Sequence, residues 1–224
     1  MHPPTYVHSK MVASITSCIT SHLIRKRPES FVGMMGVMSG QEATEKKNDI
    51  IDYAYHAGLC HDFGKLMLLD TIFTYGRKLF DFEFDVIKLH PNMGAWLLSH
   101  SVLSKKYAQA ARGHHRWFDE SRGYPYDYQR IGQREQIIID ILTVADCMDA
   151  ATDVVGRSYN RGKSLDIFIE ELRAGNGTQF NPVIVDLFDD NGFIEDIKYL
   201  LENGRGNLYR NTYMKLMEVH LNNV

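Results

Sequence analysis

An apolar pattern with the period of an α-helix is the feature that most constrains the fold of this chain. Between 134 and 155, hydrophobic residues recur every three or four positions: Ile138, Ile141, Leu142, Ala145 and Met148. This spacing puts them on one broad face of a helix. The segment from 6 to 24 repeats the pattern, and the sequence contains no series of alternating strands. We therefore expect an all-α bundle of about seven to nine helices, joined by loops of ordinary length.

Turn residues divide the rest of the chain into helical segments. We expect a helix from about Gln41 to His61, after a loop rich in Gly and Met. Pro91 disfavours helical geometry at His90 and suits the first turn of a following helix, so it marks a helix junction. Further helices are expected at 104–115 and from 182 onward. The segment from 207 to 221 fits either a final helix or a β-hairpin arm.

The length of the chain fits a single domain, and its net charge argues against binding to a long nucleic acid or an anionic membrane. The 224 residues are 44% hydrophobic, enough to bury a sizeable core in a single domain spanning residues 1–224. Because the first periodic segment begins almost at residue 6, this domain also fits the C-terminal output part of a longer protein. Lys and Arg number 25 and Asp and Glu 28, a formal charge of -3, so no overall field attracts a long nucleic acid or an anionic membrane.

Cysteine usage and hydropathy point to the cytoplasm. Three cysteines are few and odd in number, and their spacing suits neither a disulfide framework nor a metal site. The longest apolar stretch, 137–151, is interrupted by acidic residues well short of a membrane span, and the N-terminus has no signal-peptide core. We therefore expect a cytoplasmic chain without a membrane segment.

Seven ionisable residues fall at helix ends or on apolar helix faces, in five separate segments. They are His8, His61, Asp62, His90, His114, His115 and Asp146. Any one of them alone is more often a satisfied core residue than a ligand. Together they are costly to bury without partners, and a shared metal centre removes that cost. The sequence therefore predicts a buried metal site.

The ligand types and their number indicate what this site binds. Imidazole and carboxylate without thiolate favour Mn or Fe, with Mg, Ni and Zn as alternatives. Seven ligands exceed the need of one ion, and Asp62 can bridge two. Two such ions clamp a phosphodiester and activate a water as nucleophile. Lys65, one helical turn beyond His61, would stabilise phosphate charge or help to protonate the leaving oxygen. Asp62 and Lys65 are therefore the expected catalytic residues.

Five blocks of residues in a fixed order resemble the HD-GYP branch of the HD-domain phosphohydrolases. HDFGK at 61–65 is similar to HD-x-G-K, and HP at 90–91 with Gly94 is similar to HP-x-x-G. HH at 114–115 precedes GYP at 123–125, and VADCMDAATD at 144–153 is similar to ADxxDAxT. The resemblance covers the chain from His8 to about Phe188 and implies a helical bundle around a metal centre.

The resemblance also implies a reaction, a substrate and roles for single residues. Family members hydrolyse cyclic di-GMP, or a related cyclic dinucleotide such as cyclic GMP-AMP, in bacterial second-messenger signalling. A sensor domain or a second copy of the chain would be the protein partner. By position, His8, His61, Asp62 and Asp146 would hold one ion, and Asp62, His90, His114 and His115 the other. The substrate-binding residues implied are Arg157, Tyr159, Lys163 and Tyr124.

Several positions depart from the family pattern. Pro4 stands where members with three ions have a Glu, so we expect two ions. The loop HHRWFDESRGYP has Arg116 in place of a Glu, one extra residue, and Glu120 in place of a Gly. Two residues are inserted between Asp146 and Arg157, and Asn160 replaces a basic residue. Two alternatives therefore stay open: an HD phosphohydrolase acting on another nucleotide, and a nucleotide-binding signalling module with weak catalysis.

Overall fold

The computed structural model describes residues 3–68, 80–130, 132, 134–154 and 162–221. Helices make up most of these residues, and the only extended pairings among them are two isolated bridges, Arg116 with Gly123 and Asn176 with Phe180. The expected all-α class is therefore confirmed. None of the described helices is long and apolar enough to cross a membrane.

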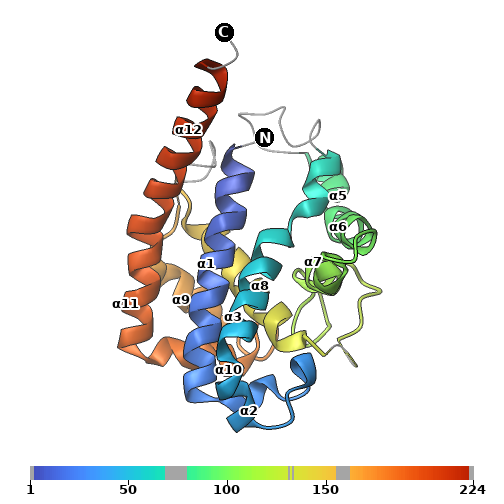
Figure 1. Cartoon of the computed structure of the whole chain (residues 1–224), viewed down its shortest axis with the longest axis vertical. Coiled ribbons are helices and arrows are strands. Elements are labelled where there is room, and N and C mark those ends of the chain that lie inside the picture. Colours follow the sequence, from blue (N-terminus) through green and yellow to red (C-terminus); the bar gives the residue numbers. More distant parts are fainter. Residues whose placement is uncertain (1–2, 69–79, 131, 133, 155–161, 222–224) are drawn as a thin grey trace.

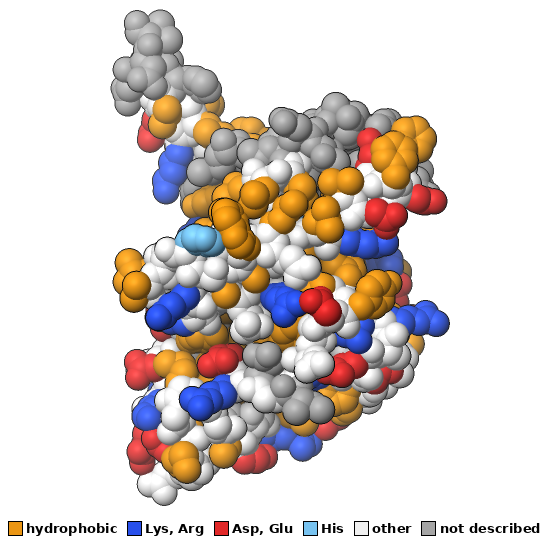
Figure 2. Space-filling model, turned by 90° about the vertical axis from the view of Figure 1, so that its right-hand side faces the viewer, with side chains coloured by type: hydrophobic (Ala, Val, Ile, Leu, Met, Phe, Trp, Pro, Cys, Tyr) orange, Lys and Arg blue, Asp and Glu red, His pale blue; other side chains and the backbone are white. Residues whose placement is uncertain are grey.

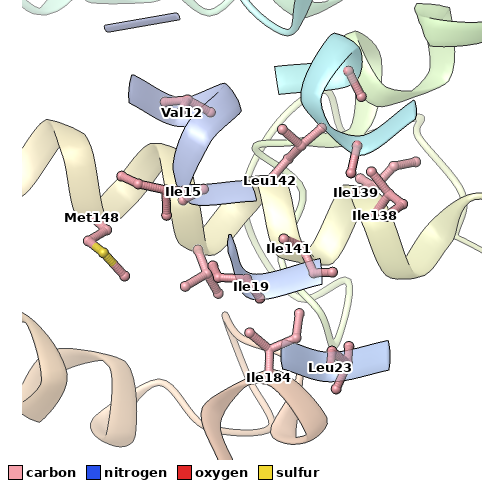
Figure 3. Close-up of a cluster of buried hydrophobic side chains, with 14 of the residues drawn as sticks. Val12, Ile15, Ile19, Leu23, Ile138, Ile139, Ile141, Leu142, Met148 and Ile184 are labelled. Atoms are coloured by element: carbon pink, nitrogen blue, oxygen red, sulfur yellow. The ribbon is translucent and has the colours of Figure 1, made fainter. Parts of the chain in front are cut away.

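Two long helices, α1 (Pro3–Lys26) and α8 (Gln136–Thr152), form the centre of the bundle. α1 begins with two prolines, which the first turn accepts because its N–H groups have no helical partner. The buried faces of the two helices meet in a cluster of hydrophobic side chains (Figure 3). Both helices were expected from their periodicity, and each also carries one of the seven predicted metal ligands.

The helix expected from Gln41 to His61 is divided at Lys46 into α2 (Gly40–Glu45) and α3 (Lys47–Cys60). α2 starts where the Ser39 side chain accepts a hydrogen bond from the Glu42 amide. α3 packs along α1, and Gly58 allows the close approach because a Cβ there would clash with the Ala13 backbone. This packing brings the end of α3 beside α1.

Short helices flank the centre on the right of Figure 1. They are η3 (Phe63–Leu68), α5 (Asp81–Ile87), α6 (His90–Ser99), η4 (Lys105–Tyr107) and α7 (Ala108–Gly113). The predicted helix junction beside Pro91 is confirmed, but α6 already includes His90, so the expectation that Pro91 keeps His90 out of helical geometry is wrong. Figure 2 shows hydrophobic side chains gathered on this side of the molecule. Phe82 of α5 and Trp96 of α6 are among the exposed large hydrophobic residues.

The C-terminal part wraps the other side of the bundle (Figure 1). Its elements are α9 (Leu165–Ala174), α10 (Pro182–Val185), η5 (Asp186–Asp189), α11 (Asn191–Tyr199), the π-helical turn η6 (Leu200–Gly204) and α12 (Arg205–Leu221). The segment from 207 to 221, which the sequence left open between helix and hairpin, belongs to the helix α12. Its first turns pack against α1, and its far end extends beyond the bundle.

Candidate metal centre

The seven predicted ligands converge on one buried cluster. Three overlapping triads have ligand atoms within 4.8 Å of one another: His8, His61 and Asp146; His61, Asp62 and His114; and His90, His114 and His115. All seven are buried except His115, whose side chain is 21% exposed. The segments that supply them are α1, the turn after α3, the start of α6, the turn after α7, and α8. Their convergence follows from the packing of these elements around α1 and α8.

Three of the histidines are oriented in the same way. His61, His90 and His114 each have Nδ1 within 2.7–2.8 Å of the carbonyl oxygen three residues earlier, at Gly58, Ile87 and Ala111. Since a carbonyl oxygen only accepts, each Nδ1 carries the proton and donates it. The Nε2 atom of each neutral ring is then left with a free lone pair. A histidine that ligates a metal commonly has this orientation.

Two of these lone pairs face each other. The Nε2 atoms of His90 and His114 lie 3.3 Å apart, and neither carries a proton when Nδ1 does. Burial, together with the neighbouring His115, His61 and His90, holds the pKa of His114 well below its usual value, so protonation does not relieve the contact. A cation between the two nitrogens would turn this repulsive arrangement into an attractive one.

Asp62 lies between the two halves of the cluster. Its Oδ2 atom is 3.4 Å from Nε2 of His8 and 3.3 Å from Nε2 of His61. Its Oδ1 atom is 3.2 Å from Nε2 of His90 and 3.9 Å from Nε2 of His114. Each carboxylate oxygen therefore faces a different group of histidines.

Negative charge dominates the half of the cluster next to α1. The Nε2 atom of His8 lies 3.0 Å from Oδ1 of Asp146, and its Nδ1 atom lies 2.7 Å from Oδ2 of Asp149. Burial lowers the pKa of His8, but the carboxylates of Asp146, Asp149 and Asp62 outweigh it and raise that pKa well above its usual value. Three buried carboxylates around one imidazole are a site where a cation is strongly favoured.

Both carboxylates that face the cluster are held in the charged form. Burial works against the charge on Asp62, yet Lys65 and His61 keep its pKa well below the usual value. The pKa of Asp146 is lowered in the same way, by His8 and His115 against the effect of burial. Burial lowers the pKa of His115 to about 3, which keeps its imidazole neutral. The charged carboxylates and the neutral His115 are in the protonation states that bind a divalent ion, whereas His8 would release a proton on binding.

Unpaired polar atoms provide a further test of whether these residues fit a metal. Nε2 of His8, Nε2 of His61 and Oδ1 of Asp62 are buried and form no hydrogen bond of good geometry in the described part of the chain, although Nε2 of His8 lies 3.0 Å from Oδ1 of Asp146. Such atoms are costly to bury without a partner. All three point into the cluster, and all are hard or borderline donors that suit Mn or Fe. The residues present therefore fit a divalent metal centre.

A pair of glycines allows the two sides of the cluster to come together. A Cβ atom on Gly64 would clash with the carbonyl of His90 and lie 2.6 Å from the amide nitrogen of Gly94. A Cβ atom on Gly94 would lie 3.0 Å from the amide nitrogen of Gly64. The backbones of η3 and α6 are therefore in direct contact, which places His90 beside Asp62. This contact gives a physical reason for the glycines of HD-x-G-K and HP-x-x-G.

Two further predicted residues border the cluster. Nζ of Lys65 donates a hydrogen bond of 2.5 Å to Oδ2 of Asp62. The ring of Tyr124 lies 4.5 Å from that of His115, and its amide donates to the His115 carbonyl. Burial, and to a lesser extent Asp146 and Asp62, raise the pKa of the Tyr124 hydroxyl, which therefore stays protonated. Lys65 and Tyr124 thus offer N–H and O–H groups at the edge of the site.

The other predicted substrate-binding residues are Arg157, Tyr159 and Lys163, of which the structure describes only Lys163. Arg157 and Tyr159, together with Asn160, lie outside the described residues. Lys163 is described, and its Nζ atom pairs with both carboxylate oxygens of Glu171 on α9, at 2.6 and 2.8 Å. The role assigned to these residues stays a prediction.

The altered GYP loop is held by the residues that depart from the family pattern. Arg116 is buried and donates to the carbonyls of Glu120 and Arg122, at 2.5 and 3.1 Å. Glu120 has φ of 60°, in the left-handed region, and its Oε1 atom accepts from the Arg130 amide at 2.7 Å. Arg130 in turn forms a two-pronged ion pair with the buried Asp140 of α8. The loop is therefore anchored to the core.

Asp149 is the residue that sequence reasoning missed. It is buried on α8, and its two oxygens contact His8 and the Arg205 guanidinium. The motif ADxxDAxT contains this position, so its spacing of three residues from Asp146 was available as a signal. Although burial opposes it, His8 and Arg205 lower the pKa of Asp149 and keep it charged.

Curated proteins with related sequences have phosphodiesterase names. A cyclic di-GMP phosphodiesterase response regulator of Xanthomonas campestris is 33% identical over 130 residues, 56% of this chain and 32% of that protein. A cyclic di-GMP phosphodiesterase of Thermotoga maritima is 31% identical over 159 residues, 69% of this chain and 42% of that protein. A 3′3′-cGAMP-specific phosphodiesterase of Vibrio cholerae is 32% identical over 138 residues, 61% of this chain and 26% of that protein. No family model matches the chain.

An all-α bundle that gathers histidines and aspartates around an HD pair defines a domain of the HD class. Within that class, the motif order from HDFGK through GYP and the curated relatives assign the chain to the HD-GYP family. The chain spans less than half the length of the relatives that it matches.

Proposed function

We propose that this chain is a metal-dependent phosphodiesterase domain that hydrolyses cyclic di-GMP or a related cyclic dinucleotide. One observation carries the proposal: the two oxygens of Asp62 each face a separate group of histidines, as a carboxylate that bridges two ions would. Two divalent ions bound there would neutralise phosphodiester charge and activate a water for attack on phosphorus.

The chain's own residues would divide between the two ion positions. The first position consists of His8, His61 and Asp146, and the second of His90, His114 and His115, with Asp62 shared. Mn or Fe suits this set of imidazoles and carboxylates, and Mg, Ni or Zn are the alternatives. We propose two ions rather than three, because Pro4 stands in the first turn of α1 where a third ion would need a carboxylate.

Lys65 and Tyr124 would act on the substrate at the edge of the cluster. Nζ of Lys65 lies 2.5 Å from Oδ2 of Asp62, from which a small side-chain movement would bring it to a non-bridging phosphate oxygen or to the leaving oxygen. Tyr124, protonated and partly exposed beside His115, would donate to phosphate or pack against a base. We assign Arg157, Tyr159 and Lys163 to substrate phosphates on the strength of the resemblance.

The names of the relatives support the substrate class, and they include both cyclic di-GMP and 3′3′-cGAMP. Because this chain covers under half of each relative, we propose that it is the catalytic output part of a longer protein with a sensor domain or a second copy as partner. We place it in the cytoplasm, where its three free cysteines would stay reduced.

The decisive experiment is turnover by metal-loaded protein. The purified chain is stripped, reloaded with Mn²⁺ or Fe²⁺, checked by elemental analysis for two ions, and incubated separately with cyclic di-GMP and with 3′3′-cGAMP. Chromatography would identify a linear dinucleotide or mononucleotides as product. The matched control is Asp62→Asn, which keeps the side-chain shape and removes the charge. Two bound ions with no turnover of either substrate would overturn the proposal.

The altered GYP loop favours one competing function, that of a signalling module that binds the nucleotide without hydrolysing it. Calorimetry on the metal-loaded chain separates the two. Tight binding of cyclic di-GMP without product would support the signalling module. Turnover of a nucleotide monophosphate or a guanosine polyphosphate, with neither cyclic dinucleotide cleaved, would support a general HD phosphohydrolase instead.

A further inference from the structure

Arg205, the first residue of α12, reaches across the bundle to the end of α8. Its side chain is buried, with a relative exposure of 6%. Nη1 donates to the carbonyl oxygen of Thr152 at 2.8 Å, and Nη2 donates to the Thr152 hydroxyl at 2.8 Å. Nη2 also donates to Oδ1 of Asp149 at 2.7 Å. The guanidinium is thus held by α8 at three points, although it belongs to a helix more than fifty residues further along the chain.

Asp149 connects Arg205 to His8, one of the predicted metal ligands. One of its oxygens is occupied by Arg205, and the other lies 2.7 Å from Nδ1 of His8. A carboxylate accepts, so Nδ1 of His8 carries the donated proton and Nε2 turns toward Asp146 and Asp62, at 3.0 and 3.4 Å. Among the described residues, His8 has no carbonyl partner of the kind that orients His61, His90 and His114. Its orientation depends on Asp149 instead.

We infer that Arg205 is a positioning residue for the metal centre, which acts through Asp149 to hold His8 in the orientation that binds a divalent ion. The inference rests on the metal centre of the proposed function. It makes α12 one of the helices that orient the ligands of that centre. It divides the cluster into two parts. His90 and His114 are each oriented by a carbonyl oxygen three residues earlier, while the His8 position depends on a helix distant in sequence.

The π-helical turn η6 explains how Arg205 comes to face α8. Buried residues of this region follow one another at intervals of four: Phe193, Ile197, Leu201, Arg205 and Tyr209. In a regular α-helix of 3.6 residues per turn, each step of four would drift by about 40° around the axis. The wider turn at 200–204 advances less per residue and reduces that drift. Arg205 therefore stays on the face that packs against the bundle.

The environment of Arg205 argues for a role beyond general stability. A surface ion pair contributes little, whereas this cation and the Asp149 carboxylate are both buried. Removing the guanidinium would leave a carboxylate with a single partner, His8. Asp149 would then be free to rotate, and His8 would lose its fixed orientation. The expected consequence is weaker metal binding at the His8 position alone.

The test measures metal binding in the absence of substrate, so its result does not depend on the phosphodiesterase activity. Calorimetric titration of the metal-free chain with Mn²⁺ is compared for the wild type, Arg205→Met and Arg205→Lys. Loss of an outer hydrogen-bond partner typically weakens a metal site about 10- to 100-fold. We expect this loss at one of two sites in Arg205→Met, and a smaller loss in Arg205→Lys, which keeps the charge. The exposed Arg210 of the same helix provides the control Arg210→Met, expected to bind both ions as the wild type does.

A double-mutant cycle separates positioning from a structural effect. If Arg205 acts through His8, Arg205→Lys in a His8→Ala background causes no further loss of affinity, because the group it positions has gone. Losses that simply multiply would overturn the inference, as would wild-type affinity at both sites in a folded Arg205→Met protein. If Arg205→Met does not fold, the cycle with Arg205→Lys decides alone. Failure of the proposed function would instead appear as normal metal binding without turnover.

Discussion

Replacing Gly64 by alanine is expected to damage the metal centre without touching any ligand. An added Cβ would lie 2.6 Å from the Gly94 amide nitrogen, about 0.8 Å inside the 3.4 Å of ordinary contact, and would clash with the His90 carbonyl. Both obstacles are backbone atoms, which cannot turn aside as a side chain can. The start of α6 must therefore move away from η3, and His90 moves with it, away from Asp62.

The expected magnitudes follow from this displacement. Overpacking of a tight interior costs about 1–3 kcal/mol. In a domain of this size, that corresponds to a fall in Tm of about 2–12 °C. Since the shift carries His90 out of its place 3.2 Å from Asp62, we expect metal affinity at the His90 position to fall about 10- to 100-fold. Turnover should fall with it, because the proposed reaction uses both ions.

The assay combines thermal melting with elemental analysis of Gly64→Ala, and Gly206→Ala is the matched control. Gly206 is exposed on α12, and a Cβ there would meet no atom within 4 Å. Alanine in an exposed helix is favoured over glycine by about 0.5–1 kcal/mol, so the control should melt slightly higher and keep its metal. Wild-type Tm and metal content in Gly64→Ala would refute the argument that the glycine contact positions His90.

Three further predictions concern other parts of the site. Lys65→Met should keep both ions but lower kcat by about 10²- to 10³-fold, measured on cyclic di-GMP; an unchanged kcat would exclude Lys65 from transition-state stabilisation. Removal of metal with a chelator should lower the Tm measured by scanning fluorimetry, since the ions bind the folded state, and readdition of Mn²⁺ should restore it. Arg116→Leu should lower the free energy of unfolding by about 1–3 kcal/mol in a denaturant titration, because the Glu120 and Arg122 carbonyls lose their donor.

The candidate ligands were predictable from the sequence because each lies where a helix ends or on a helix face. His90 stands before a proline, and His114 follows the short helix α7, so the positions of both were set by local signals. The helix-forming pattern of α8 likewise placed Asp146 on a buried face. What the sequence could not give was the orientation of each ring, which depends on a carbonyl three residues away.

Long-range contacts account for what the sequence missed. α12 has few apolar residues in a regular pattern, and the buried positions that lead into it, Ile197, Leu201 and Arg205, follow a spacing of four that the π-helical turn keeps on one face. Packing against α1 stabilises its first turns. The contact of Arg205 with Asp149, 56 residues earlier, has no signal in a single sequence. Asp149 itself was visible in the motif, but its partner was not.

Two residues of the GYP loop that depart from the family pattern, Arg116 and Glu120, depend on each other. A glutamate in the left-handed region at Glu120 costs about 1–2 kcal/mol relative to the glycine of the family pattern. That cost is offset where the Glu120 side chain accepts from the Arg130 amide and its carbonyl accepts from Arg116, the other altered residue. The two changes therefore support each other and form a loop with its own hydrogen bonds. Reverting Arg116 to the family's glutamate alone would place a carboxylate against two carbonyl oxygens, so restoring the family residue would destabilise this loop.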